Sequence, residues 1–165
     1  MGVPGFYRWL VQRYPLTRRH LSDLAYPKFN HFYIDFNCII YNCLQIVKAN
    51  EAGDNTPLFN EVCRYLDLLV QIIQPETTLY IAVDGPAPLA KCSQQRARRF
   101  TAAKYHVPGT FATANISVGT EFMDKLHKHL LKFFEERVNE DSTWSKPKLI
   151  YSSYKTPGEG EHKFF

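Results

Sequence analysis

Three short apolar runs, each with the length and composition of a buried strand, are followed by acidic residues. The runs comprise residues 31–34, 79–83 and 149–151. The acidic residues that follow them are Asp35, Asp84, Glu159 and Glu161. In an open α/β sheet, ligands bind outside the carboxyl ends of the strands, and hard cations take oxygen ligands. The pattern therefore predicts a Mg²⁺ or Mn²⁺ site at this edge of a sheet, with metal-assisted chemistry that most often acts on phosphates.

Each of these acidic residues also has a simpler explanation. An aspartate at the end of a strand often caps the next helix or turns the chain, and two glutamates interleaved with glycines at residues 158–161 are typical of an acidic turn. Capping explains the set less well, because its members follow three separate strands. Two metal ions about 4 Å apart can activate a water and stabilise the leaving oxygen in phosphodiester hydrolysis. Four carboxylates suffice for one ion and part of a second. We assign none of the histidines His127, His129 and His162 to a metal.

A basic helix is expected directly after the second run, over residues 89–104. Four of its polar residues recur at i, i+4, i+7 and i+8 and therefore project from one face. They are Lys91, Gln95, Arg98 and Arg99. Arginine forks suit phosphate, lysine adds a point charge and glutamine adds a neutral donor. A solvated basic face is the usual explanation of such a pattern. Here the helix begins a few residues after Asp84, so we expect its face to look back at the carboxylates and to hold a terminal phosphate.

Positive charge is concentrated around this helix. The net charge of +4 is too small to identify a binding partner. Between Gly85 and Thr120, however, there is no aspartate or glutamate, while five lysines and arginines occur. This local excess indicates a surface for a polyanion or a phosphate group.

Strand and helix patterns alternate along the chain. Strands are expected at residues 31–36, 78–83 and 149–151. Helices are expected at residues 5–14, from residue 37 onward, and at 58–74, 89–104 and 121–139. Thr120 is the expected cap of the last helix, residues 107–120 a surface loop, and residues 139–148 a turn segment. This order predicts an α/β fold with a mostly parallel sheet and helices on its faces.

Composition limits the class of protein. The chain has 165 residues, of which 45% are hydrophobic, enough for one domain with a real core. Its four cysteines lack C-x-x-C spacing, which disfavours zinc and disulfide frameworks and favours a reducing compartment. No apolar run approaches the roughly 18 residues of a membrane span. We expect a soluble intracellular protein that acts in the nucleus or the cytoplasm, away from membranes.

Several motifs together resemble the XRN family of 5′→3′ exoribonucleases, at the start of its nuclease domain. The matching stretches are Met1-Gly2-Val3-Pro4, Arg8-Trp9, Arg13-Tyr14-Pro15, Ile34-Asp35-Phe36-Asn37, Val83-Asp84-Gly85-Pro86-Ala87-Pro88, Ala90-Lys91, Gln94-Gln95-Arg96, Arg98-Arg99-Phe100 and Thr156-Pro157-Gly158-Glu159-Gly160-Glu161-His162-Lys163. They cover the chain from end to end, in order and with family-like spacing. This is far more specific than any single short motif.

The resemblance implies a flap-endonuclease-like or PIN-like α/β fold, with residues 1–165 as the N-terminal part of the nuclease domain. It also implies that the family activity, processive Mg²⁺-dependent removal of one nucleotide at a time, applies here. The catalytic metal ligands would be Asp35, Asp84, Glu159 and Glu161. The pocket that selects the 5′-monophosphate end of single-stranded RNA would be Lys91, Gln95, Arg98 and Arg99.

The chain departs from the family pattern in two ways. Tyr41 stands where the family's helix after the first strand usually carries a histidine, and a phenol is a poor proton shuttle near neutral pH. The family also supplies further aspartates from later strands, whereas this chain ends at Phe165. We therefore expect a truncated sheet, an under-coordinated second metal, marginal stability and little or no activity for this chain alone.

Three functional hypotheses follow. The leading one is a metal-dependent 5′→3′ exoribonuclease that acts on 5′-monophosphorylated RNA. The competing one is a non-catalytic RNA 5′-phosphate-binding module that kept the pocket and lost hydrolysis. A carboxylate phosphatase or nucleotide-binding α/β protein is disfavoured, because no D-x-D follows the first strand and no G-x-G-x-x-G or Walker loop occurs. The sequence predicts no particular protein partner or oligomeric state.

Overall fold

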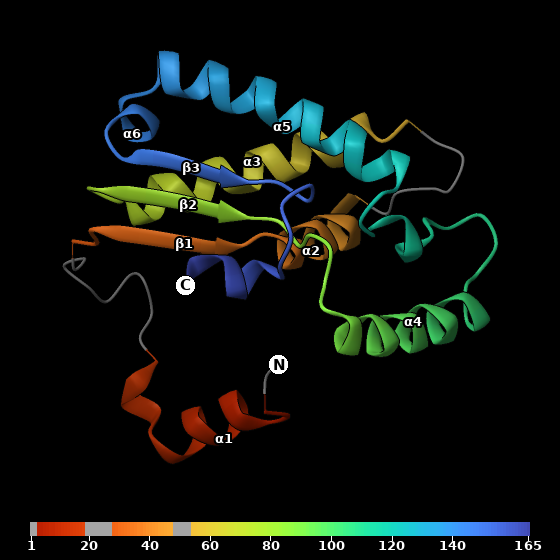
Figure 1. The fold of residues 1–165 in the computed structure, drawn as a ribbon. Helices are drawn as coiled ribbons and strands as arrows, with labels where there is room; N and C mark the ends of the chain where they lie inside the picture. Colours follow the sequence, from red (N-terminus) through yellow and green to blue (C-terminus); the bar gives the residue numbers. More distant parts are fainter. Residues whose placement is uncertain (1–2, 19–27, 48–53) are drawn as a thin grey trace.

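A parallel sheet of three strands, in the order β1-β2-β3, forms the centre of the molecule (Figure 1). The computed structural model describes residues 3–18, 28–47 and 54–165. The strands are β1 (His31–Asp35), β2 (Thr78–Ala82) and β3 (Lys148–Ser152). Asp35 pairs with Ala82, and Ala82 with Ser152, so the carboxyl ends of all three strands meet at one edge. The predicted parallel sheet flanked by helices is confirmed, and the arrangement is consistent with a PIN-like fold. The first two residues of the N-terminal motif lie outside the described residues.

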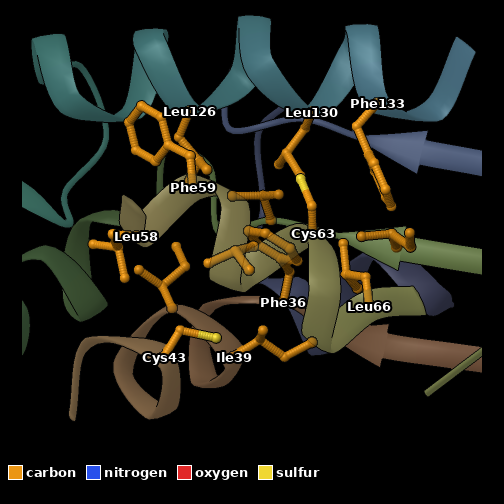
Figure 2. Close-up of a cluster of buried hydrophobic side chains, with 14 of the residues drawn as sticks. Phe36, Ile39, Cys43, Leu58, Phe59, Cys63, Leu66, Leu126, Leu130 and Phe133 are labelled. Carbon is orange, nitrogen blue, oxygen red and sulfur yellow. The ribbon is translucent and has the colours of Figure 1, made fainter. Parts of the chain in front are cut away.

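Helices cover one face of the sheet and enclose the core with it (Figures 1 and 2). They are α2 (Asn37–Val47), α3 (Thr56–Ile73), α5 (Glu121–Glu140) and α6 (Ser142–Ser145). Side chains alternate along a strand, so Ile34 and Ile81 both point to this face and are buried. Leu66 of α3 and Leu130 of α5 meet them in the same cluster. Each such fully buried side chain contributes about 1.5–3 kcal/mol of hydrophobic stabilisation.

Helix α5 begins where the sequence predicts. The hydroxyl of Thr120 accepts a hydrogen bond from the Met123 amide at 3.3 Å, which satisfies one of the free amides of the first turn. Glu121 and Asp124 add negative charge to that turn, which the helix dipole favours. The predicted cap is therefore confirmed.

The segment predicted as a turn, residues 139–148, is instead largely ordered in helices. Helix α5 continues to Glu140, and α6 follows directly. Asp141 causes this, because its carboxylate accepts a hydrogen bond from the Thr143 amide at 2.8 Å and caps α6. Trp144 then inserts fully into the core, and its indole N–H donates to Asp67 at 2.9 Å. The prediction therefore missed α6, a short helix whose buried residue is Trp144.

The segment predicted as a surface loop, residues 107–120, also packs on the core. Phe111 and Ile116 are buried, and the ring of Phe111 lies 5.0 Å from that of Phe122 in α5. A short 3₁₀ helix, η3 (Thr113–Asn115), lies between the two buried residues. The rest of the segment is exposed or half-exposed, as predicted, but the glycine, serine and threonine content gave no indication of its two buried apolar residues.

The second face of the sheet is only lightly covered within the described residues. Tyr33 and Tyr80 point to it, since they alternate with the core-facing residues. The ring of Phe164, in η4 (Gly160–Phe164), lies 5.4 Å from each tyrosine ring. Two further helices, α1 (Phe6–Arg13) and α4 (Leu89–Lys104), bury none of their residues and project from the body of the molecule in Figure 1. A short 3₁₀ turn, η1 (Pro15–Thr17), follows α1. Among the described helices none has the length and apolar character needed to cross a bilayer.

Candidate functional site

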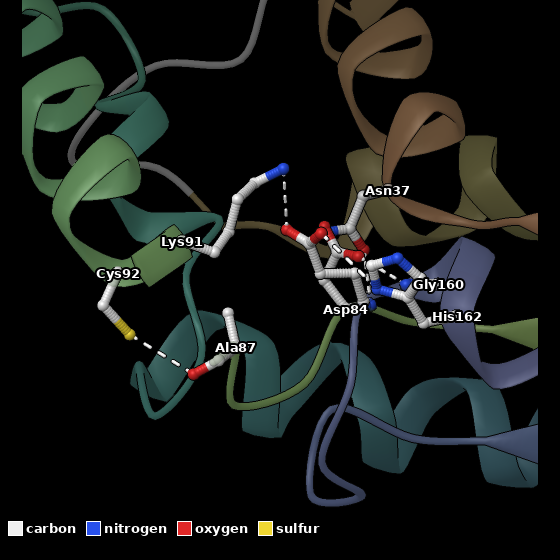
Figure 3. Close-up of polar contacts among 8 residues, drawn as sticks. Asn37, Asp84, Ala87, Lys91, Cys92, Gly160 and His162 are labelled. Atoms are coloured by element: carbon white, nitrogen blue, oxygen red, sulfur yellow. Dashed lines mark hydrogen bonds and ion pairs between the residues drawn. The ribbon is translucent and has the colours of Figure 1, made fainter. Parts of the chain in front are cut away.

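Asp84 lies at the carboxyl edge of the sheet, just beyond the end of β2. Its carboxylate accepts hydrogen bonds from the Asn37 side chain, at 2.9 Å, and from the Gly160 amide, at 2.8 Å (Figure 3). The Asp84 amide in turn donates to the Asn37 side chain at 3.3 Å. The start of α2, the end of β2 and the start of η4 are therefore joined through one carboxylate. Both of its oxygens are oriented before any ligand binds.

Two glycines allow the loop before η4 to lie against the turn after β2. The Gly85 amide donates to the Gly158 carbonyl at 2.8 Å, and the Gly158 amide donates to the Pro86 carbonyl at 3.0 Å. A Cβ at Gly85 would overlap the carbonyl oxygen of Thr156. Gly158 has a φ of 110°, a conformation that side-chain-bearing residues rarely adopt. These contacts bring the two glutamates that follow Gly158 next to Asp84.

Asp35, the last residue of β1, has an oxygen without a partner. Its Oδ1 is buried and accepts no hydrogen bond from the described residues. Burial, followed by the charges of Asp84 and Glu161, raises the pKa of Asp35 above its usual 3.8. A Cβ at Gly160 would lie 2.5 Å from this same oxygen, so glycine leaves the space around it clear. A buried, unpaired carboxylate oxygen beside other carboxylates is a position that a bound cation would stabilise.

Glu159 is the one buried acidic residue of the described chain. The Lys91 ammonium lies 3.0 Å from its Oε1, and His162 Nδ1 lies 3.7 Å from its Oε2. Glu159, Glu161 and His162 can each offer one ligand atom to a metal, and these atoms lie within 4.8 Å of one another. Sequence reasoning assigned His162 to no metal. Its position three residues after Glu159, one turn along η4, is the signal that could have found it.

Lys163 fastens η4 to the ends of the strands. Its ammonium donates to the Val83 carbonyl at 2.6 Å and to the Ser153 carbonyl at 2.9 Å. Burial lowers the pKa of Lys163 below its usual 10.5, although Asp84 acts in the opposite direction. Sequence reasoning also missed this role, because a lysine at the end of an acidic motif gives no indication of which carbonyls it will reach.

A cavity of about 260 Å³ opens beside the carboxylates. Its walls are formed by Asn37, Tyr41, Asp84, Gln95, Arg98, Arg99, Ala102, Thr113, Ala114, Ile116, Ser117, Val118 and Met123. Arg98 and Arg99 form no ion pair with an acidic side chain of the described chain, so their donors are available to an anion. Burial, followed by the charge of Asp84, raises the pKa of Tyr41, which Arg99 partly offsets. Tyr41 therefore keeps its proton near neutral pH.

The structure thus gathers the predicted residues into two adjoining groups. Asp35, Asp84, Glu159 and Glu161 lie around the carboxyl edge of the sheet. Gln95, Arg98 and Arg99 face the cavity that Asp84 also lines. Lys91 does not line this cavity and reaches instead toward the carboxylates (Figure 3). Helix α4 starts so close to the site because two prolines after Asp84 lead into it, and the Cys92 thiol donates back to the Ala87 carbonyl at 3.3 Å.

Comparison with known proteins gives one consistent result. The whole chain, residues 1–165, matches the family described as XRN 5′-3′ exonuclease N-terminus. It is 37% identical to 5′-3′ exoribonuclease 1 of Homo sapiens, a match that covers 99% of this chain and 11% of the human protein. It is 36% identical to 5′-3′ exoribonuclease 1 of Saccharomyces cerevisiae, covering 99% of this chain and 12% of the yeast protein. It is 34% identical to 5′-3′ exoribonuclease 2 of Arabidopsis thaliana, covering 99% of this chain and 21% of the plant protein. The chain therefore spans a small part of the length of each relative.

Proposed function

The chain belongs to the XRN 5′-3′ exonuclease family, and on that premise we propose that it forms the N-terminal part of a metal-dependent 5′→3′ exoribonuclease. Its substrate in this proposal is single-stranded RNA with a 5′-monophosphate. One observation carries the proposal. Asp84 lines the cavity with Arg98 and Arg99, while its carboxylate accepts a hydrogen bond from Gly160, the residue between the two glutamates of η4. The arginines suited to phosphate and the carboxylates suited to a metal are therefore joined through Asp84.

The residues at the edge of the sheet fit a hard divalent cation. Asp35, Asp84, Glu159 and Glu161 would hold Mg²⁺ or Mn²⁺, because both take oxygen ligands. The unpaired oxygen of Asp35 supports this assignment, since burial and the neighbouring carboxylates of Asp84 and Glu161 raise the pKa of this residue and a bound cation would offset both. When bound, such an ion activates water and stabilises the leaving oxygen of a phosphodiester.

The cavity residues would determine which RNA end is accepted. Arg98 and Arg99 offer planar forks that match phosphate oxygens, and Gln95 adds a neutral donor. A 5′-hydroxyl end brings no charge to this pocket and would lose these charge-assisted contacts. Tyr41, protonated and half-exposed, can donate a hydrogen bond or stack on a base. We assign it no proton transfer, because its raised pKa lies further still from neutrality.

We further propose that the 165-residue chain alone has little or no hydrolytic activity. The family resemblance places further aspartates on later strands, and the chain spans 11% of the human relative. The competing function, an RNA 5′-phosphate-binding module without hydrolysis, is favoured by a different observation. The cavity is already lined by three of its predicted residues, whereas Glu159 is paired with a lysine. Action inside the cell, in the nucleus or the cytoplasm, belongs to the same proposal.

An assay with three RNA ends tests the proposal. Single-stranded RNA with a 5′-monophosphate, a 5′-hydroxyl or a 5′-triphosphate is offered with Mg²⁺ to the natural chain, to Asp35→Ala and to Arg98→Ala. Arg96→Ala is the matched control, because Arg96 is exposed on the same helix and does not line the cavity. Cleavage of the monophosphate end alone, lost in Asp35→Ala, supports the nuclease. Selective binding of that end without cleavage supports the module. Equal treatment of all three ends contradicts both.

A further inference from the structure

Lys91 lies on the phosphate-binding face of α4 and yet contacts the other half of the site. Helical spacing places it on the same face as Gln95, Arg98 and Arg99, all three of which line the cavity. Its ammonium nevertheless lies 3.0 Å from Glu159 Oε1. The pair is well shielded from solvent, with side-chain exposures of 18% for Lys91 and 8% for Glu159. Lys91 therefore lies on the same helix face as the cavity residues but contacts a carboxylate of the candidate metal site.

The contact has a clear physical cause. A buried carboxylate is costly unless a positive charge or hydrogen bonds compensate it. Among the described residues the ion-pair partners of Glu159 are Lys91 and the more distant, exposed His162. A cation held by Glu159 would compensate the same charge and would repel a neighbouring ammonium. Lys91 and a divalent ion therefore compete for one carboxylate.

We propose that Lys91 is a switch that couples occupancy of the metal site to the strength of the phosphate pocket, an inference that rests on the function proposed above. Without a cation, Lys91 neutralises Glu159 and the pocket acts with Gln95, Arg98 and Arg99. With Glu159 engaged by a cation, the flexible four-carbon stem of Lys91 turns its charge toward the pocket one helical turn away. The pocket then gains a third cationic side chain.

The coupling has a thermodynamic consequence. If a cation strengthens phosphate binding through Lys91, phosphate must strengthen cation binding by the same factor. An RNA end would then be held most tightly when the carboxylates are loaded for hydrolysis. The switch would thus discourage unproductive binding of RNA to a metal-free site.

Two titrations on the 165-residue chain test this inference. The first measures the Kd of Mn²⁺ alone by calorimetry. The second measures the Kd of a 5′-phosphorylated trinucleotide with phosphorothioate linkages, which resist cleavage, with and without Mn²⁺. The variants are Lys91→Met and, as a matched control, Lys104→Met, because Lys104 is an exposed lysine of the same helix that does not line the cavity.

The switch predicts a distinctive pattern for Lys91→Met. Mn²⁺ binding tightens by about fivefold or more, because a competing charge in a shielded pair is removed. Trinucleotide binding weakens by about tenfold with Mn²⁺ and stays unchanged without it. Lys104→Met changes neither constant. Weaker Mn²⁺ binding in Lys91→Met, or an equal loss of trinucleotide affinity in both conditions, would overturn the switch.

Arg98→Ala separates a failure of the switch from a failure of the proposed function. It is expected to weaken trinucleotide binding both with and without Mn²⁺. If Arg98→Ala leaves that binding unchanged, or if the natural chain binds neither ligand, the proposed site itself is wrong and the switch falls with it. Helix α4 buries none of its residues, so Arg98→Ala and Lys104→Met are not expected to unfold the chain. Lys91→Met leaves the buried carboxylate of Glu159 without its lysine and should cost stability, so circular dichroism first checks that all three variants are folded.

Discussion

Helices α3 and α4 have similar lengths, 18 and 16 residues, and opposite surroundings. Helix α3 buries one face, including Leu66, in the core, whereas α4 buries no residue at all. Packing fixes the position of α3, since hydrophobic burial is the largest favourable term in folding. The position of α4 depends instead on its connection to Asp84 and on the polar groups that it faces. Burial in the core does not fix a helix of this kind, and α4 instead presents Arg98 and Arg99 to the cavity that Asp84 also lines.

The largest expected effect is a loss of stability when a buried residue of α3 is truncated. Leu66→Ala should lower the free energy of unfolding by about 2–5 kcal/mol, because Leu66 is fully buried and its removal leaves a cavity. Phe100→Ala, on the outside of α4, should change it by less than about 0.5 kcal/mol, since Phe100 is 79% exposed. Urea unfolding followed by circular dichroism measures both. Similar losses for the two variants would show that α4 packs against the core after all.

The next effect concerns binding and falls on α4. Arg98→Ala should weaken the affinity for 5′-phosphorylated RNA by about 10- to 100-fold, because a charge-assisted hydrogen bond contributes about 1.5–3 kcal/mol. Arg96→Ala removes the same charge from the same helix and should lower affinity only a few-fold, through long-range attraction that salt screens. Fluorescence anisotropy at two salt concentrations distinguishes them. Equal, salt-sensitive losses would mean that α4 is a general basic surface without a phosphate pocket.

The smallest effect is a pH-dependent change in stability at Asp35. Burial raises its pKa, so the folded state holds this proton more tightly than the unfolded state. Ionisation of Asp35 therefore lowers stability at neutral pH, and this cost disappears as the pH falls through the native pKa to the unfolded value near 3.8. Asp35→Asn should stabilise the metal-free chain at pH 7 and have little effect at pH 3.5.

Asp141 provides the opposite case for this experiment. Hydrogen bonds from Thr143 lower its pKa, so its ionised form contributes stability that is present above the unfolded pKa and lost as the pH falls through the native one. Asp141→Asn should therefore destabilise the chain at pH 7. Thermal melts of the three proteins at both pH values measure the effects. Destabilisation by Asp35→Asn at pH 7 without a cation would remove the electrostatic argument for a metal at that position.

Regular elements could be predicted from the sequence because their patterns are local. The strands end within a residue or two of their expected positions, α4 spans residues 89–104 as predicted, and Thr120 caps α5. Helix α6 and the buried Phe111 escaped prediction. The cap of α6 by Asp141 is local, but the burial of Trp144 and Phe111 depends on side chains of other elements. Trp144, for example, is held by Asp67 in α3.

In the candidate site, too, features that follow from a local pattern could be predicted, whereas contacts made by long flexible side chains could not. That carboxylates would lie at one edge of the sheet could be predicted from strand order, while their metal-binding role stays a prediction. The pairing of Lys91 with Glu159 could not, because helical spacing fixes where a side chain starts and not where a flexible stem ends. The bonds of Lys163 to two carbonyl groups are of the same kind. The contacts of long charged side chains are therefore the part of the site that is hardest to predict from the sequence.

If the proposed phosphate pocket and the carboxylates form one site, a metal ion and a phosphate bound there lie close together, and paramagnetic relaxation detects this directly. Mn²⁺ broadens the ³¹P resonance of a 5′-phosphorylated nucleotide only when ion and phosphate are held close together. We predict strong broadening with the natural chain at Mn²⁺ concentrations that leave the free nucleotide sharp. Arg98→Ala, which keeps the carboxylates, and Asp84→Asn, which keeps the arginines, should each abolish the excess. Broadening that is unchanged in both variants, or absent although Mn²⁺ and nucleotide both bind, would contradict the account.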